Sequence, residues 1–227
     1  TNANANVIFQ YRAVINDGSE QFNLEGTGPL FGAPTQGNAV GGTTNVPDGQ
    51  YQILSLIDDN TANGDLNSIY LNNGLNAQGA NPGDINLNGN SLSLGASFDN
   101  THHSNINVAE FIIYQNAHDA TQRHKVNSYL SLKYGMTMDQ TSPTNYIASD
   151  GSPMWDATGT QAGSGQMQEG YHNDIFGIGR DKSSCFQQQI SRSQNDDAII
   201  TLSTDDNFTD ANGTHASIDQ DLSFLTL

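Results

Sequence analysis

Residues 108–136 read VAEFIIYQNAHDATQRHKVNSYLSLKYGM, and this stretch decides the fold that we expect. Its first part is rich in β-branched and aromatic residues, which favours a buried strand over residues 105–114. Asp119 can then cap a helix, with Gln122 three residues later as its capping-box partner. Apolar residues continue at helical spacing up to Gly135, a residue suited to the left-handed conformation that ends helices. The stretch therefore predicts one strand followed by one short helix.

The rest of the chain alternates short apolar runs with polar turns and shows no repeat of fixed period. Turn signals such as Asn16-Asp17-Gly18 and Asn72-Asn73-Gly74 separate the runs, and the Gly-rich residues 35–44 are expected to form a loop. Many short strands between turns predict an antiparallel β-sandwich. The other expected strands are residues 7–15, 21–24, 30–31, 51–57, 68–71, 87–98, 145–147, 175–178, 186–190, 198–202 and 222–227.

The acidity of the chain comes from a shortage of basic residues. Lys and Arg number 7 against 24 Asp and Glu, which gives a formal net charge of -17 although only 14% of the residues are charged. Such a surface repels nucleic acid and anionic membranes, because binding their phosphates requires basic residues. We therefore expect no nucleic-acid partner, and divalent cations are the natural partners of this surface. The sequence has no apolar run of membrane-spanning length, so we expect no direct membrane insertion.

Cys185 is the single cysteine, so the chain cannot form an internal disulfide. One thiol fits a secreted bacterial protein that calcium stabilises, and it fits a cytosolic protein equally well. The sequence shows no signal peptide and begins without Met. We therefore expect a piece of a longer chain with neighbouring domains.

The stretch of residues 108–136 resembles the closing strand and helix of LamG-like, concanavalin A-like jelly-roll domains in large bacterial surface proteins. Their pattern is an Ala-Glu-apolar-apolar-Tyr strand, a helix and then Tyr-Leu-x-x-Lys-Tyr-Gly. Two upstream segments are also similar to strands of that fold. The matching residues are Ala109, Glu110, Tyr114, Tyr129, Leu130, Lys133, Tyr134 and Gly135, with Tyr70-Leu71-Asn72-Asn73-Gly74 and Leu94-Gly95 upstream.

Residues 146–151, Trp155-Asp156 and residues 173–181 (NDIFGIGRD) resemble an extension that a subset of these domains carries in adhesins and in gliding-motility or sorting-tagged proteins. The resemblance implies an all-β jelly-roll sandwich with one peripheral helix, at the surface of a bacterium. It places the core in residues 1–140, where the family's first strands have no counterpart, and the extension in residues 141–227. We expect both parts to pack as a single domain.

The sequence offers little support for catalysis. Retaining glycosidases, which also occur on this fold, need two carboxylates about 5 Å apart. The four Glu residues form no E-x-D-x-x-E pattern. The sequence also contains no G-x-S-x-G elbow for a nucleophilic serine. Cys185 has no patterned His beside it, so we expect it to be a small buried or half-buried residue and not a nucleophile. We therefore expect a protein that is not an enzyme, with a glycoside hydrolase or lyase of this fold as the catalytic alternative. The Glu residues are Glu20, Glu25, Glu110 and Glu169.

Acidic clusters at three places make calcium the expected ion, because calcium takes six to eight oxygen ligands. The ordinary interpretation is that Asp and Asn serve as turn and capping residues. Zinc has less support, because the adjacent His102 and His103 would point to opposite faces of a strand. We expect His118 and His124, beside the helix start, at the surface. The clusters are Asp58, Asp59, Asn63 and Asp65; Asp150, Asp156, Asp174 and Asp181; and Asp205, Asp206, Asn207, Asp210 and Asn212.

Trp155, Tyr171 and His172 are the aromatic residues that can stack on a sugar ring or hold a peptide, although a single Trp is also a natural core residue. The Gly-rich residues 37–42 and 159–170 lack the Lys and the following helix of a phosphate loop, so they are expected to be surface loops. We expect a non-catalytic, lectin-like module of a secreted adhesin that binds a glycan or protein surface through calcium-stabilised loops. A structural spacer without a ligand is the main alternative.

Overall fold

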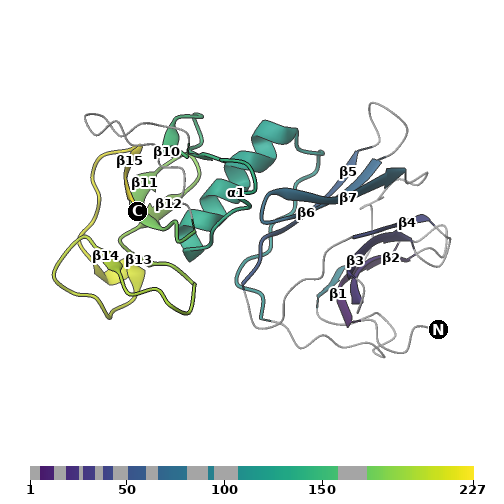
Figure 1. The fold of residues 1–227 in the computed structure, drawn as a ribbon, viewed down its shortest axis with the longest axis horizontal. Helices are drawn as coiled ribbons and strands as arrows, with labels where there is room; N and C mark the ends of the chain where they lie inside the picture. Colours follow the sequence, from purple (N-terminus) through teal and green to yellow (C-terminus); the bar gives the residue numbers. More distant parts are fainter. Residues whose placement is uncertain are drawn as a thin grey trace. The chain divides into compact units, whose positions relative to one another are not determined.

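The computed structural model describes residues 6–12, 19–25, 28–33, 38–42, 51–59, 66–80, 92–94, 107–157 and 173–227. These residues form antiparallel strands and one α-helix (Figure 1), so the predicted all-β class with one short helix is confirmed. The jelly-roll arrangement stays a prediction. The chain divides into two compact units: the first consists of Thr1–Gln50, Leu54–Leu71 and Leu75–His118, and the second of Tyr51–Ile53, Asn72–Gly74 and Asp119–Leu227.

The first unit contains a five-stranded sheet with the order β4-β3-β2-β1-β8. Its strands follow the predicted apolar runs, and β1 pairs with β2 from Asn6↔Leu24 to Arg12↔Ser19. The loop that we expected over residues 35–44 is wrong in part, because β4 lies within it. Val40 lies in this strand opposite Phe31 and is buried, so the strand contains a buried apolar residue despite the Gly residues around it. The strands are β1 Asn6–Arg12, β2 Ser19–Glu25, β3 Gly28–Ala33, β4 Asn38–Gly41 and β8 Leu92–Leu94.

The second sheet of this unit has the order β5-β6-β7 and is made of β5 Leu54–Asp59, β6 Leu66–Leu71 and β7 Gly74–Ala80. Apolar cross-strand pairs set the register of β5 and β6, with Leu56 opposite the fully buried Ile69. Strand β7 was not predicted. Its sequence, GLNAQGA, has one large apolar residue, Leu75, which is exposed, so it carries no alternating pattern.

The predicted buried strand over residues 105–114 is wrong for the part that the structure describes. Residues 107–114 belong to no strand, and their large apolar side chains are 38–53% exposed. Strand propensity measures how well a side chain fits a half-covered pleated surface, so tertiary context can override it. The exposed side chains are Val108, Phe111, Ile112, Ile113 and Tyr114.

The predicted helix is confirmed with both of its caps as α1, Ala120–Tyr134. Asp119 Oδ1 accepts the backbone N–H of Gln122 at 2.7 Å, and Gln122 Oε1 accepts the backbone N–H of Asp119 at 3.0 Å. Gly135 ends the helix with a φ of 63° and donates its N–H to the carbonyl oxygen of Ser131. A Cβ at this position would also collide with the carbonyl oxygen of Arg192, so the position requires glycine.

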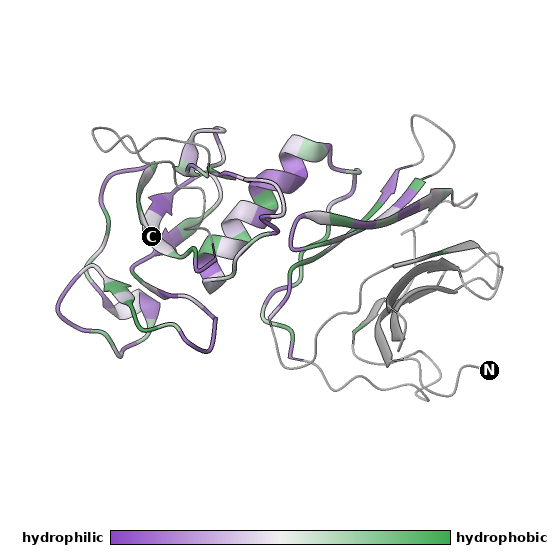
Figure 2. Ribbon diagram, viewed as in Figure 1, coloured by the Kyte–Doolittle hydropathy of each residue, from purple (hydrophilic) through white to green (hydrophobic). Residues whose placement is uncertain are grey.

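The buried face of α1 is narrow and made mostly of small polar residues. Figure 2 shows short hydrophobic bands on a helix that is otherwise hydrophilic or neutral. Ser128 Oγ accepts the backbone N–H of Ile147 at 3.1 Å, so this face bonds to the backbone packed against it. The buried residues of α1 are Asn127, Ser128, Ser131 and Leu132.

The second unit pairs its strands in three small sheets: β9 with β10, β11 between β12 and β15, and β13 with β14. The predicted strand over residues 186–190 is in fact two strands that meet at Gln189, and β10 was not predicted. The suggested boundary between residues 140 and 141 lies inside this unit. The strands are β9 Tyr146–Ile147, β10 Pro153–Trp155, β11 Gly177–Asp181, β12 Phe186–Gln188, β13 Ile190–Arg192, β14 Thr201–Ser203 and β15 Ser223–Thr226.

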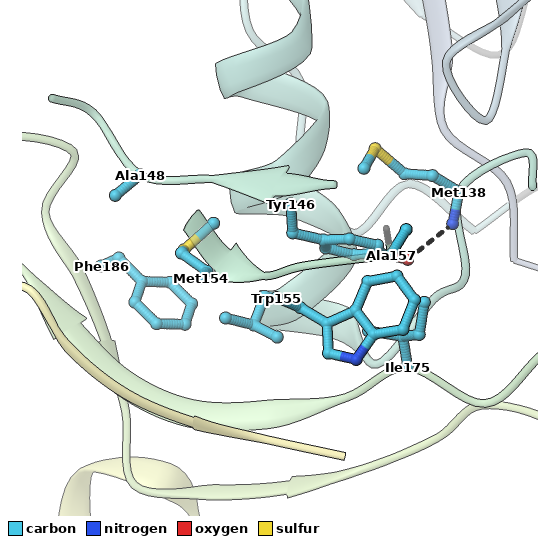
Figure 3. Close-up of a cluster of buried hydrophobic side chains, with 9 residues drawn as sticks. Met138, Tyr146, Ala148, Met154, Trp155, Ala157, Ile175 and Phe186 are labelled. Atoms are coloured by element: carbon cyan, nitrogen blue, oxygen red, sulfur yellow. Dashed lines mark hydrogen bonds between the residues drawn. The ribbon is translucent and has the colours of Figure 1, made fainter. Parts of the chain in front are cut away.

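The core of the second unit surrounds Tyr146, which is fully buried (Figure 3). Its ring meets Trp155 edge to face at 5.9 Å, a favourable geometry for two aromatic rings. Its hydroxyl accepts the backbone N–H of Met138 at 2.8 Å and donates to the carbonyl oxygen of Met136 at 3.3 Å. Burial raises the pKa of Tyr146 above its usual value. The buried hydroxyl of Tyr146 is thus satisfied by backbone groups on both sides.

The described part of the chain contains no helix that could cross a bilayer. Helix α1 has 15 residues and many polar side chains, whereas a membrane span needs about 20 predominantly apolar residues.

Candidate functional site

The GIGRD segment, which is among the most specific parts of the family resemblance, forms strand β11 at the centre of its sheet. Gly177 pairs with Thr226 and Gly179 pairs with Phe224 on β15. A Cβ on Gly177 would lie 2.6 Å from Thr226 Cγ2, and one on Gly179 would collide with the ring of Phe224. Both glycines therefore make room for the side chains of β15, which is a packing role.

Asp181, at the end of this segment, is a buried carboxylate that holds two loops. Its Oδ2 accepts the backbone N–H of Ser149 at 2.8 Å, and its Oδ1 accepts the Ser149 hydroxyl at 2.7 Å and the backbone N–H of Ser183 at 3.1 Å. Burial raises the pKa of Asp181, but the hydrogen bonds from Ser149 and Ser184 outweigh burial and lower it below its usual value. The carboxylate is therefore charged and committed to the loop backbone.

The other members of the second acidic cluster lie in separate loops. Asp150 Oδ1 accepts the backbone N–H and the hydroxyl of Ser152, at 2.8 and 2.7 Å, which lowers the pKa of this exposed carboxyl. Asp174 Oδ1 accepts the hydroxyl of Ser193 at 2.9 Å. Asp156 is half-buried in the segment after β10. In the ranges that the structure describes, no group of three or more His, Cys, Asp or Glu side chains is placed to hold a metal ion.

The third acidic cluster lies in the loop after β14, where its members organise the loop itself. Asn207 Oδ1 accepts the backbone N–H of Thr209 at 3.0 Å, and its Nδ2 donates to Asp210 Oδ2 at 2.6 Å. Asn212 Oδ1 accepts the backbone N–H of Gln189 at 2.6 Å. Asp206 is exposed. These contacts are those of turn-forming side chains, which is the ordinary interpretation of such clusters.

Asp205 and His215 form the most connected polar group of this loop. Asp205 Oδ1 lies 2.9 Å from His215 Nδ1 and accepts the backbone N–H of Asn207 at 3.0 Å, while its Oδ2 accepts the backbone N–H of Ala216 at 2.9 Å. The hydrogen bond from His215 is the main cause that lowers the pKa of Asp205 to about 2. His215 is buried, and sequence reasoning gave it no role.

Ser203 completes a serine, histidine and aspartate set whose geometry does not suit nucleophilic catalysis. Its hydroxyl oxygen lies 3.2 Å from His215 Nδ1, the same ring nitrogen that faces Asp205. A histidine that activates a serine uses one ring nitrogen for the serine and the other for the carboxylate. In this loop the second nitrogen, Nε2, faces the carbonyl oxygen of Asp210 at 3.2 Å. The arrangement holds the ring in place and activates no hydroxyl.

The first acidic cluster lies in part on β5, where Asp58 and Asp59 are half-buried; Asn63 and Asp65 lie outside the described residues. Asp58 stands opposite Asn67 of β6, so the two side chains share one face of the sheet. The Asn67 side chain is fully buried, and neither of its polar atoms has a hydrogen-bond partner in the described part of the chain. An unsatisfied buried amide is costly, so this position calls for a ligand or a further polar contact.

Of the three aromatic residues predicted to bind a ligand, the structure describes only Trp155; Tyr171 and His172 lie outside the described residues. Trp155 is 6% exposed and packs in the core with Tyr146, so its ring is not presented to a ligand.

His124 and Asn73 form a half-buried connection that the sequence did not reveal. Asn127 Nδ2 donates to Asn73 Oδ1 at 3.0 Å, Asn73 Nδ2 lies 3.1 Å from His124 Nδ1, and His124 Nε2 lies 2.6 Å from the carbonyl oxygen of Asn145. These contacts fit a neutral ring with its proton on Nε2. The expectation that His124 lies at the surface is wrong, because the ring is half-buried between α1 and the Asn72-Asn73-Gly74 turn. Of this connection, the sequence revealed only the Asn72-Asn73-Gly74 turn signal.

Cys185 is exposed, which contradicts the expectation of a buried or half-buried residue. It has a φ of 56° and closes the turn between β11 and β12 by donating its backbone N–H to the carbonyl oxygen of Lys182 at 3.1 Å. Connecting turns run over the protein surface, so a residue in a turn can be exposed whatever the polarity of its side chain.

Residues 122–227 match the model of a protein family that is described as a domain of unknown function, DUF8202. The matched region begins in α1 and contains every strand from β9 to β15. No curated protein matches the chain. The second unit is therefore similar to this family, and its hydrogen-bonded acidic loops are features of the matched region.

Proposed function

We propose that this chain is a non-catalytic module of a secreted bacterial surface protein, and that its second unit acts as a rigid spacer. The observation that carries this proposal is the use of its carboxylates. Asp181 and Asp205 each accept several hydrogen bonds from the backbone and side chains of the loops around them. Side chains committed in this way stabilise a fixed shape and are not poised for proton transfer or nucleophilic attack.

The proposal includes calcium at the first acidic cluster. Asn67 supports this location, because its buried amide oxygen accepts no hydrogen bond from the described residues and stands on the same face as Asp58. Amide and carboxylate oxygens are ligands that calcium prefers. A bound cation would satisfy the amide oxygen and neutralise the neighbouring carboxylate.

A binding role is the second candidate, and the exposed residues 107–114 favour it. Five large apolar side chains in this segment are 38–53% exposed, and contiguous exposed apolar surface commonly marks an interaction site. The ligand would be a protein surface, because apolar side chains recognise other apolar surface. A glycan ligand would instead depend on aromatic residues such as Tyr171.

The 227-residue chain can be tested for the spacer, binding and hydrolytic roles in one set of experiments. A glycan array and a pull-down against extracellular proteins, each with millimolar calcium, would measure binding. Release of reducing ends from the same polysaccharides would measure hydrolysis. The spacer predicts neither saturable binding nor hydrolysis. If the chain binds a protein saturably and Phe111→Ser weakens that binding, the protein-binding role replaces the spacer role. If the chain hydrolyses a polysaccharide, the non-catalytic proposal is overturned.

Calcium is tested separately by thermal unfolding with calcium and with a chelator. A ligand that binds only the folded state raises Tm with its concentration, so calcium should raise Tm and the chelator should reverse the rise. Asn67→Ala should abolish this response, whereas Asp150→Asn, which removes an exposed carboxylate of another cluster, should keep it. An unchanged Tm at saturating calcium would remove the ion from the proposal and leave the spacer role intact.

A further inference from the structure

The ring of His215 is enclosed by the loop that follows β14, and both of its nitrogens face oxygen acceptors. Nδ1 lies 2.9 Å from Asp205 Oδ1, and Nε2 lies 3.2 Å from the carbonyl oxygen of Asp210. The side chain has no exposed surface, so water does not provide an alternative partner. A ring nitrogen that faces such an acceptor must carry a proton to form a hydrogen bond.

Neither neutral tautomer of the ring satisfies both contacts. With the proton on Nε2, the lone pair of Nδ1 points at the carboxylate of Asp205. With the proton on Nδ1, the lone pair of Nε2 points at the carbonyl oxygen of Asp210. The Ser203 hydroxyl, 3.2 Å from Nδ1, can donate to the neutral ring but leaves the carboxylate oxygen in place. The charged imidazolium, with two N–H donors, fits both contacts at once.

The charges around the ring act in the same direction. Asp205 and Asp210 both favour the charged form, and the connection between β12 and β13 contributes the neutral amide of Gln189, whose Nε2 donates to the carbonyl oxygen of His215 at 3.0 Å. The hydrogen bond to Asp205 is the main cause that raises the pKa of His215 above its usual value.

The same ion pair joins the two ends of the loop. Asp205 lies at the start of the loop, separated from β14 by Thr204, and His215 and Ala216 lie at its end. Thr204 reinforces this closure by donating its hydroxyl to the carbonyl oxygen of Ala216 at 2.7 Å. When the ring loses its proton, Asp205 loses its charged partner, and the junction retains only hydrogen bonds of the backbone and hydroxyl groups.

We propose that His215 is a proton-dependent latch, which holds residues 204–216 closed while its ring is charged and loosens them when the ring becomes neutral. A histidine whose pKa is raised on folding stabilises the fold fully below its unfolded pKa of 6.5, and this stability is lost as the pH rises through the folded pKa. At the acid end, the contribution of Asp205 is lost as the pH falls through its folded pKa of about 2. The latch is therefore closed in mildly acidic solution and loosens as the pH rises through the folded pKa of His215, which lies above its usual value.

Nuclear magnetic resonance of the complete chain tests the latch. The ¹⁵N shifts of the His215 ring report its protonation, and hydrogen exchange of Asn207 and Ala216 reports loop opening, because Asp205 accepts both of their N–H groups. We expect the ring to lose its proton only above pH 6.5, the ordinary pKa of histidine, and the protection factors of both amides to fall as it titrates. A ring that is neutral below pH 6.5, or protection that is constant through its titration, would overturn the latch.

Two variants separate the latch from a general loss of structure. Asp205→Asn keeps an acceptor but removes the charge, so the ring should titrate at lower pH and the loop should loosen at the same lower pH. His215→Gln should make loop protection independent of pH over the range in which the wild-type ring titrates. His118→Gln, which changes a histidine beside Tyr114, should retain the wild-type response. A wild-type pH response in His215→Gln would show that another group controls the loop.

Discussion

Two histidines of the second unit hold neighbouring segments together by opposite means. His124 joins α1 to the Asn72-Asn73-Gly74 turn through a chain of neutral amides, and its Nδ1 lies against a donor. His215 joins the ends of one loop through a carboxylate, and both of its nitrogens lie against acceptors. The first connection depends on the number of hydrogen bonds, whereas the second depends on charge. The difference shows that the partners of a histidine, more than its burial, determine what it contributes.

The largest loss of stability is expected at the most buried residue of the hydrogen-bond network that joins Asn73, His124 and Asn127. Asn127→Ala removes the donor to Asn73 Oδ1 from a fully buried position and should lower the free energy of unfolding by about 1–3 kcal/mol, because it leaves a polar partner unsatisfied. Urea unfolding measures this change. Ser142→Ala, a change in a loop outside this network, is the control and should remain within about 0.5 kcal/mol of the wild type. Equal stability of the two variants would mean that the network adds nothing.

The second prediction separates the two histidines. His124→Ala should lower the free energy of unfolding by about 1 kcal/mol through the loss of two hydrogen bonds, and it should keep the fall of stability with rising pH that His215 causes. His215→Gln should remove that fall. Urea unfolding at several pH values above 6.5, the ordinary pKa of histidine, makes the comparison. If both variants change the pH dependence alike, the contrast between the two sites fails.

The smallest change in Tm is expected for Asp150, which belongs to an acidic cluster of the sequence as Asp205 does but has a different environment in the structure. Asp150 is exposed and accepts its hydrogen bonds from Ser152 within its own turn. Asp150→Asn should therefore leave Tm nearly unchanged, whereas Asp205→Asn should lower it in mildly acidic solution, where the ion pair with His215 is complete. Differential scanning calorimetry of both variants at one pH is the measurement. A large decrease for Asp150→Asn would show that exposed turns also contribute much of the stability.

The parts of the fold that were predicted correctly are those whose signals are local. The capping box of Asp119 and Gln122 and the terminal Gly135 define α1 without any help from the rest of the chain. Strand β7 was missed because it has no alternating pattern of its own and is held in the sheet by its neighbour β6. Residues 107–114 were assigned to a strand on propensity alone, which does not report whether a sheet edge is available.

The candidate site was predictable only in its residue types. Asp150, Asp181 and Asp205 stood out as clustered acids, but the backbone groups that they bind lie up to 32 residues away in sequence, as with Asp181 and Ser149. The sequence carried no sign that His215 would lie beside Asp205, because an ion pair across a loop has no fixed spacing. Contacts of this kind depend on the completed fold, so a sequence pattern identifies the participants and leaves their partners open.

The turn that ends in Cys185 has a practical consequence. The chain contains one thiol, and the structure exposes it in the turn that follows the buried carboxylate of Asp181. A maleimide fluorophore would therefore attach at a single position of the unmodified polypeptide. Its emission would report on the surroundings of that turn during unfolding, without any engineered cysteine.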